Sequence, residues 1–209
     1  MSNSGVIQFK NNSEYGVYLH WNGGRDSIEA FLKYCELKGY MNNDIPRFIQ
    51  TVSNYFGGNN SIYLEPINKI DGDHGTYIVD NWKIIDRKDF EHNEQKEYNL
   101  EEMLLEIDKA QPVKLQLGEN FLNSEIVLTS SLQIGDKVFK YDEVYCIYKE
   151  CTVIGRGLNE FQNGTNVFNI PYVDKYNGCG DGYKDNINNY IKDKEIRKIK
   201  GVVKHDGFI

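Results

Sequence analysis

Apolar residues gather in short strand-like runs at the start of the chain, with polar residues between them. The runs Val6–Lys10 and Gly16–Trp21 contain β-branched and aromatic residues, and the Asn-Asn-Ser sequence that separates them is typical of a hairpin turn. Two later runs, Ser61–Pro66 and Thr76–Ile85, predict a second pair of strands around the turn sequence Asp71–Gly75. The first half of the chain is therefore expected to begin and end with strands.

Between these pairs of strands, the apolar residues recur with helical spacing. A first helix is predicted after Gly24, because Asp26 can cap it and Glu29 completes a capping box. A second helix is predicted from about Asp44 to Phe56, with Pro46 in its first turn, where the missing N–H does no harm. The apolar faces are Ile28, Phe31, Leu32 and Cys35 in the first helix, and Ile45, Phe48, Ile49, Val52 and Phe56 in the second.

These elements predict an α+β protein with two domains. Residues 1–87 have the order β-β-α-α-β-β, and consecutive hairpins favour an antiparallel sheet with two helices on one face. Residues 111–209 contain short β-rich runs joined by tight turns, which predicts a mainly β domain of the SH3-like barrel kind. A helix from Asn186 to Ile199 is expected near its end.

The segment between these domains, residues 88–110, is expected to form an acidic linker followed by a helix. The helix has an apolar side made of Leu100, Met103, Leu104 and Ile107. From Asp89 to Asp108, eight acidic residues stand against one lysine, a local charge of −7 that equals the formal charge of the whole chain. Such a segment could imitate the charge of a phosphate backbone.

Composition narrows the classes of function. The chain has 24 basic and 31 acidic residues, which argues against a general nucleic-acid binder, since such a protein needs cations to displace counterions. There is no apolar run of membrane-spanning length and no signal-peptide pattern, so a cytoplasmic protein is expected. The four cysteines form no CxxC pair, and neither a metal site nor a cofactor is predicted.

The sequence between the second strand and the first helix predicts a ligand site. Glycines before a helix allow backbone N–H groups to converge on an anion, and Arg25 could add a bidentate phosphate contact. Trp21 or Tyr18 could stack on a base, and His20 could form a hydrogen bond. The alternative is an ordinary turn in which Asp26 uses the helix N–H groups itself. The predicted site comprises Tyr18, His20, Trp21, Asn22, Gly23, Gly24 and Arg25.

Two other clusters have a weaker chemical signal. Asp71, Asp73 and His74 could hold a metal, but the distal Glu of a Ca²⁺ loop is missing and a polar hairpin turn explains them as well. Cys179 could act as a nucleophile only with a nearby base, and His205 is the one histidine in that half. No GxSxG, HExxH or SxxK motif occurs, so no catalytic residue is assigned and a non-enzymatic protein is expected.

The run GVYLHWNGGRDSIEAFLKYCELKGY resembles the opening of small uncharacterised proteins carried by phages and prophages of low-GC bacteria, most strongly over about residues 15–58. The strings IGDKVF, NIPYVDKY and INNYI look like a second module found on such elements. The resemblance implies a phage accessory protein. Small phage proteins without enzymatic motifs often act in counter-defence, some by sequestering nucleotide immune signals at oligomer interfaces and others by imitating DNA charge.

The leading hypothesis is a non-enzymatic binding protein that acts in the cytoplasm of an infected bacterium. Its partner would be a small anionic, nucleotide-derived ligand, and a homo-oligomer is compatible with this role. The first alternative is an acidic inhibitor that imitates nucleic acid and blocks a host defence nuclease. A metal-dependent nucleotide hydrolase built on Asp71, Asp73 and His74 is the second, and a virion or assembly component is a further one.

Overall fold

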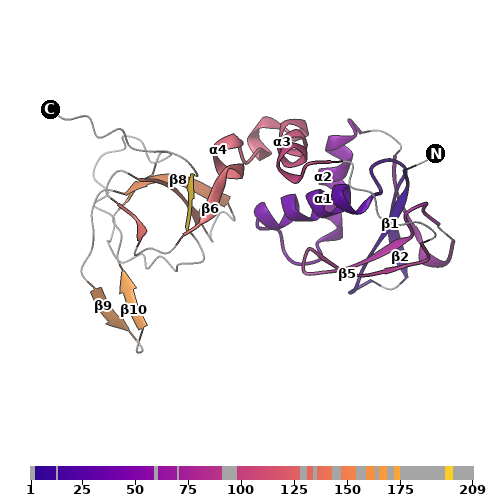
Figure 1. Ribbon diagram of the computed structural model, residues 1–209, viewed down its shortest axis with the longest axis horizontal. Coiled ribbons are helices and arrows are strands. Elements are labelled where there is room, and N and C mark those ends of the chain that lie inside the picture. The colour runs from indigo at the N-terminus through magenta and orange to yellow at the C-terminus, as the bar shows by residue number, and fades with distance from the viewer. Residues whose placement is uncertain are drawn as a thin grey trace. The chain divides into compact units, whose positions relative to one another are not determined.

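The computed structural model describes residues 3–12, 14–58, 61–69, 71–90, 98–127, 131–133, 136–142, 147–153, 159–162, 165–168, 172–174 and 196–199. The chain divides into two compact units, residues 1–118 and residues 119–209. In Figure 1 the elements of the first unit run from indigo to magenta along the chain. Each unit is described by itself, and the predicted mixed α and β character is confirmed.

The first unit is built on a five-stranded sheet with the strand order β3-β2-β1-β4-β5. Its central pair, β1 and β4, runs parallel, and the other neighbours are antiparallel. The expected antiparallel sheet is therefore wrong at its centre. The reason is that β3 pairs with β2, so the chain must cross to the other side of β1 before β4 begins. The strands are β1 Gly5–Phe9, β2 Tyr15–Leu19, β3 Ile62–Pro66, β4 Thr76–Asp80 and β5 Lys83–Lys88.

The predicted strand Thr76–Ile85 is in fact a hairpin. Asn81 and Trp82 form its turn with φ values of 50° and 60°, the left-handed conformation that two-residue hairpins require. Trp82 is an unusual turn residue, and tertiary contacts explain its position in the turn. Its side chain is buried, and its indole N–H donates to the carbonyl of Tyr40 at 3.2 Å. A tertiary contact thus places the turn where sequence chemistry favours a continuous strand.

Three helices complete the first unit, namely α1 Arg25–Leu37, α2 Ile45–Tyr55 and α3 Leu100–Ala110. Asp44 caps α2 as its side chain accepts from the N–H of Arg47, and Asn99 caps α3. Helices α1 and α2 contact the sheet, whereas α3 packs on α1 and α2 (Figure 1). Two short 3-10 turns, η1 Ile67–Lys69 and η2 Val113–Leu115, lie in the connections.

The core of this unit lies between the sheet and the first two helices. Phe9 of β1 meets the rings of Phe48 and Trp82 edge to face at centroid distances of 5.4 and 6.0 Å. Phe31 of α1 meets Phe48 at 6.5 Å. Each such ring contributes about 1.5–3 kcal/mol through burial, and edge-to-face geometry adds to this. The core fixes the ends of β1, β2 and α1, where the predicted ligand site lies.

Asp108 attaches α3 and the following segment to the same unit. This buried carboxylate accepts from the hydroxyl of Tyr34 at 2.6 Å and from the N–H groups of Leu117 and Gly118 at 2.7 and 2.9 Å. The helix predicted as part of a linker is therefore packed within the first unit. The observed division at residue 118 differs from the expected domains 1–87, 88–110 and 111–209, because the apolar side of α3 is covered by α1 and α2.

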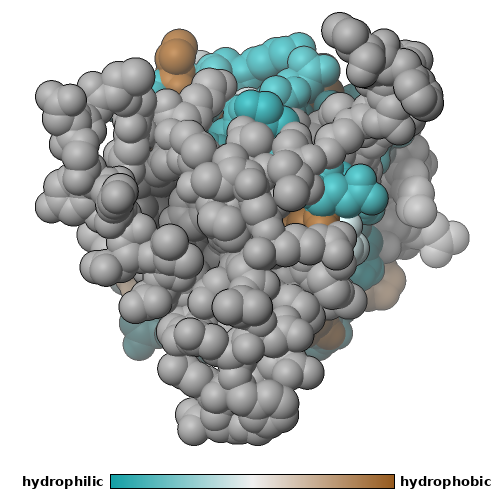
Figure 2. Space-filling view, turned by 90° about the vertical axis from the view of Figure 1, so that its left-hand side faces the viewer, coloured by the Kyte–Doolittle hydropathy of each residue, from teal (hydrophilic) through white to brown (hydrophobic). Residues whose placement is uncertain are grey.

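The second unit contains a five-stranded sheet with the order β11-β8-β7-β12-β6 and a separate β9–β10 hairpin. All of its pairings are antiparallel, and its described residues form no closed barrel. The face in Figure 2 shows mostly hydrophilic residues where the described part of the chain is coloured. The elements are α4 Glu119–Leu122, β6 Ser124–Ile126, β7 Lys137–Asp142, β8 Ile147–Val153, β9 Asn159–Gln162, β10 Thr165–Phe168, β11 Tyr172–Asp174 and β12 Ile196–Ile199.

The helix predicted from Asn186 to Ile199 is wrong over its last residues, which form β12; residues 186–195 lie outside the described part. Strand β12 pairs with both β7 and β6. Arg197 donates to the hydroxyl and carbonyl oxygens of Ser124 at 2.8 and 2.7 Å, and Lys198 pairs with the buried Asp136 at 2.9 Å. The pairing of β12 with a strand on each side outweighs the helical spacing of Ile196 and Ile199.

Candidate ligand-binding site

The loop between β2 and α1 continues the sheet before it turns. The N–H of His20 donates to the carbonyl of Ser61 at 2.8 Å, which extends the β2–β3 pairing past Leu19. Asn22 then reverses the chain with φ 53°. Gly24 occupies the N-cap position of α1 without a side-chain cap, so the helix begins at Arg25. The predicted cap, Asp26, thus lies inside the first turn.

Gly23 allows close packing of two backbones. Its N–H donates to the carbonyl of Asn3 at 2.8 Å, and a Cβ at this position would lie 2.1 Å from the nitrogen of Gly5. The chain before β1 therefore uses the N–H that was predicted to bind a phosphate. The glycine is required because any side chain would collide with backbone atoms.

The charged groups at the start of α1 are engaged within the chain. Arg25 donates to Glu29 at 2.7 Å, one helical turn later. Asp26 accepts from the N–H of Ser27 at 2.8 Å and from the N–H of Tyr98 at 2.7 Å. A carboxylate already occupies the position where the helix dipole favours an anion. Part of the predicted phosphate cradle is therefore occupied by the chain itself.

The ring side chains of the predicted site form a continuous row with one further tyrosine. Tyr63 of β3 lies opposite Tyr18 with ring centroids 5.9 Å apart, and His20 follows Tyr18 at 6.2 Å. Trp21 meets His20 edge to face at 4.6 Å. We call Tyr63, Tyr18, His20 and Trp21 the aromatic row.

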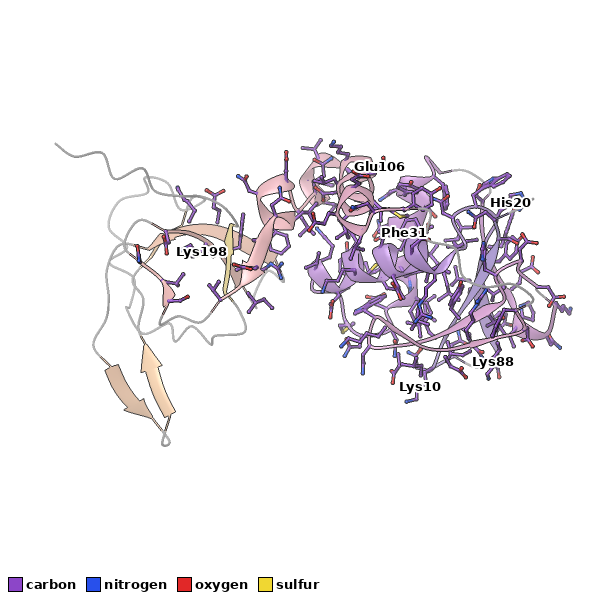
Figure 3. The ribbon with its side chains drawn as sticks, viewed as in Figure 1. Lys10, His20, Phe31, Lys88, Glu106 and Lys198 are labelled. Atoms are coloured by element: carbon purple, nitrogen blue, oxygen red, sulfur yellow. The ribbon has the colours of Figure 1, made fainter. Side chains whose placement is uncertain are left out.

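The aromatic row is accessible. Trp21 is 47% exposed and Tyr63 is 43% exposed, while Tyr18 and His20 are partly buried. Figure 3 shows His20 at the periphery of the unit and the core residue Phe31 in its interior. The alternation along β2 explains this, because Leu19 points into the core and its neighbours point to the other face. The row can therefore present ring faces and edges to a ligand.

Asn22 joins the loop to two tyrosines from other elements. Its amide nitrogen donates to the hydroxyl of Tyr55 at 3.4 Å, and the hydroxyl of Tyr98 donates to its amide oxygen at 3.4 Å. Burial, followed by the nearby charge of Glu106, raises the pKa of Tyr55. Tyr55, Tyr98 and Tyr63 were not among the predicted site residues, because only tertiary contacts bring them to the β2–α1 loop.

Two residues of the predicted cluster Asp71, Asp73 and His74 have structural contacts. Asp73 accepts from the hydroxyl and N–H of Ser4 at 2.8 and 3.2 Å, and the carbonyl of His74 accepts from Arg87 at 2.7 Å. These bonds fix the loop to the start of β1. The described residues include no group of three or more His, Cys, Asp or Glu side chains placed to hold a metal.

Cys35 is not available as a nucleophile. Cys35 is buried in α1, and burial raises the pKa of its thiol to about 12, so it stays protonated. Cys179 and His205 lie outside the described residues.

The structure describes only part of the acidic segment, because residues 91–97 lie outside the described residues. Within α3, Glu101, Glu102 and Glu106 are exposed, while Asp108 is buried and bonded.

Comparisons of the chain with models of protein families, with curated proteins and with solved structures find no match. In the described part of the chain, every helix is too short or too polar to cross a membrane.

Proposed function

We propose that this chain is a non-enzymatic binding protein that acts in counter-defence, a role often found among small phage proteins of the kind that its opening sequence resembles. It captures a nucleotide-derived ligand in the cytoplasm of an infected bacterium. The observation that carries this proposal is the aromatic row with Trp21 exposed at its end. Stacking of a base on one ring contributes about 1–3 kcal/mol, and every base has a face that can stack.

The structure changes how such a ligand would be held. The N–H of Gly23 is used inside the chain, so Gly23 positions the loop and its N–H is not offered to a phosphate. Arg25 stays a candidate phosphate contact because its ion pair with Glu29 is solvent-exposed, and such pairs contribute only about 0–1 kcal/mol. A phosphate can compete with Glu29 for the guanidinium. Arg25→Ala should then weaken binding by about 1–3 kcal/mol.

Tryptophan fluorescence can test the proposal, because the chain has two tryptophans in opposite environments. Trp21 is 47% exposed and Trp82 is 4% exposed, so a stacked base should quench only Trp21. We expect nucleoside 5′-monophosphates to quench the wild-type chain, and Trp21→Ala to abolish both quenching and binding in calorimetry. Phe90→Ala is the matched control, since Phe90 is 52% exposed and lies outside the aromatic row.

Native mass spectrometry of protein purified from infected cells identifies the natural ligand. A mass excess of a few hundred daltons that is released on denaturation would support capture. The proposal is contradicted if the protein carries no added mass during infection and no nucleotide changes the emission of Trp21.

The acidic inhibitor is the second candidate, and the exposed carboxylates of α3 favour it. Glu102 and Glu106 lie one turn apart on the helix, and Glu101 is exposed beside them. Changing these three residues to Gln should weaken binding to a basic host nuclease, and binding to the wild type should weaken steeply with salt. Inhibition that survives the triple change would reject it.

The remaining expectations stay predictions. They are the SH3-like barrel of the second unit, the metal-dependent hydrolase and the virion component. Asp73 gives the hydrolase little support, because Ser4 already donates to its carboxylate twice.

A further inference from the structure

The two edges of the first unit's sheet differ in character. Strand β5 carries charged residues along its length, and β3 carries mostly apolar ones. In β3, Tyr63 and Leu64 are 43% and 52% exposed. Natural sheets protect their edges with charges, above all lysine, and with proline; β5 carries four charged residues, whereas β3 carries only Glu65 and Pro66. The charged residues of β5 are Lys83, Asp86, Arg87 and Lys88, and the apolar residues of β3 are Ile62, Tyr63, Leu64 and Pro66.

The β2–β3 register shows which backbone groups of β3 point outward. Ser61 accepts from His20, and the N–H of Ile67 donates to Glu14, so odd-numbered residues of β3 bond to β2. In an antiparallel pair the even-numbered residues then direct their N–H and C=O groups to the other side. These are Ile62, Leu64 and Pro66. Among the described residues, no strand lies beyond β3.

We propose that β3 pairs with β3 of a second copy of this chain, antiparallel and about a two-fold axis at Leu64. The two Leu64 residues then exchange both of their backbone hydrogen bonds. Each Ile62 N–H donates to the Pro66 carbonyl of the other copy. In this register the outward N–H groups of Ile62 and Leu64 both donate hydrogen bonds. Pro66 has no N–H and contributes only its carbonyl oxygen. A two-fold interface requires such self-complementarity.

The same register keeps the Glu65 carboxylates of the two copies apart and extends the aromatic row. Glu65 falls opposite Tyr63 of the second copy, so the two glutamates do not face each other. Because Tyr63 lies beside Tyr18 on the outer face, the second copy adds Glu65 to the end of the aromatic row. Two rows thus become one surface across the interface. The pairing itself does not require a ligand and so stands apart from the proposed function.

Analytical ultracentrifugation of the full chain tests the pairing. We expect the wild type to sediment as a dimer at micromolar concentration and Leu64→Lys to sediment as a monomer, because two lysines would then oppose each other. Ile85→Lys is the matched control: Ile85 is 54% exposed on the opposite edge, and this variant should stay dimeric. A monomeric wild type, or a Leu64→Lys variant that dimerises like Ile85→Lys, overturns the proposal.

A cross-link provides a second readout that does not depend on how Leu64→Lys folds. Residues in a hydrogen-bonded antiparallel pair have Cα atoms about 5.5 Å apart, a distance that a disulfide can span. Leu64→Cys should form a covalent dimer on mild oxidation, and Ile85→Cys should show only the background of the wild-type cysteines. Equal cross-linking of the two variants contradicts the pairing.

Discussion

At the residue scale, one buried carboxylate connects three parts of the first unit. Asp108 is 4% exposed, and it accepts hydrogen bonds from Tyr34 of α1 and from the N–H groups of Leu117 and Gly118. A buried charge costs free energy unless donors surround it, so each of these bonds contributes more than an average one. Burial, and then the bond to Asp108, raises the pKa of Tyr34.

Tyr34→Phe should therefore destabilise the unit by about 1–3 kcal/mol at pH 7, because it removes one donor from Asp108. The pKa of Tyr34 in the folded state lies above the usual value of about 10, so its contribution is complete below that pH. It is lost as the pH rises further, since the unfolded tyrosine then ionises first. Urea unfolding at pH 7, 9 and 10.5 should show the gap between wild type and variant narrowing at the highest pH.

The exposed Tyr15 provides the control for this measurement. Tyr15→Phe should change the unfolding free energy at pH 7 little. A gap for Tyr34→Phe that stays constant up to pH 10.5 would show that the Tyr34–Asp108 bond does not set the stability of the unit.

At the scale of elements, the glycines of the β2–α1 loop were predicted to bind an anion, whereas Gly23 allows two backbones to pack closely. Gly23→Ala would place a methyl group 2.1 Å from the nitrogen of Gly5, which backbone movement alone can relieve. The equivalent atom in Gly24→Ala would lie 3.2 Å from the Asp26 carboxylate, a side chain that can shift. We expect a loss of about 3 kcal/mol for Gly23→Ala and less than about 1 kcal/mol for Gly24→Ala in thermal unfolding. Equal losses would contradict the close approach.

The sequence predicted what depends on local spacing and missed what depends on distant pairing. Helices α1 and α2 begin close to their expected positions because apolar faces are local signals, and in α2 the cap residue Asp44 is one as well. The parallel β1–β4 pair and the turn at Trp82 depend on tertiary contacts that no short window contains. Likewise, Tyr18 and His20 were predicted site residues, but Tyr63 joins them only through the β2–β3 register.

At the scale of the whole molecule, the proposed ligand site and the proposed dimer edge are adjacent features of the first unit. Tyr63 belongs to the aromatic row and also to β3, so a change in pairing would alter the end of the row. A ligand that binds across both copies would stabilise the dimer, since anything that binds one state shifts the population toward it. These features leave the second unit without an assigned role, and the compactness of the first unit predicts that it is structurally independent.

That independence can be tested with two fragments. Residues 1–118 retain the compact first unit, including the N–H groups of Leu117 and Gly118, which donate hydrogen bonds to Asp108. Residues 1–110 end where the sequence predicted the boundary and lose both donors, together with Gln111, whose side chain donates to the carbonyls of Thr51 and Ile107. We expect the longer fragment to unfold cooperatively in urea and the shorter one to be less stable by about 3 kcal/mol or more, because a buried carboxylate loses two of its three donors. Equal stability of the two fragments would place the end of the unit at α3 and would show that the bonds from Leu117 and Gly118 to Asp108 do not stabilise it.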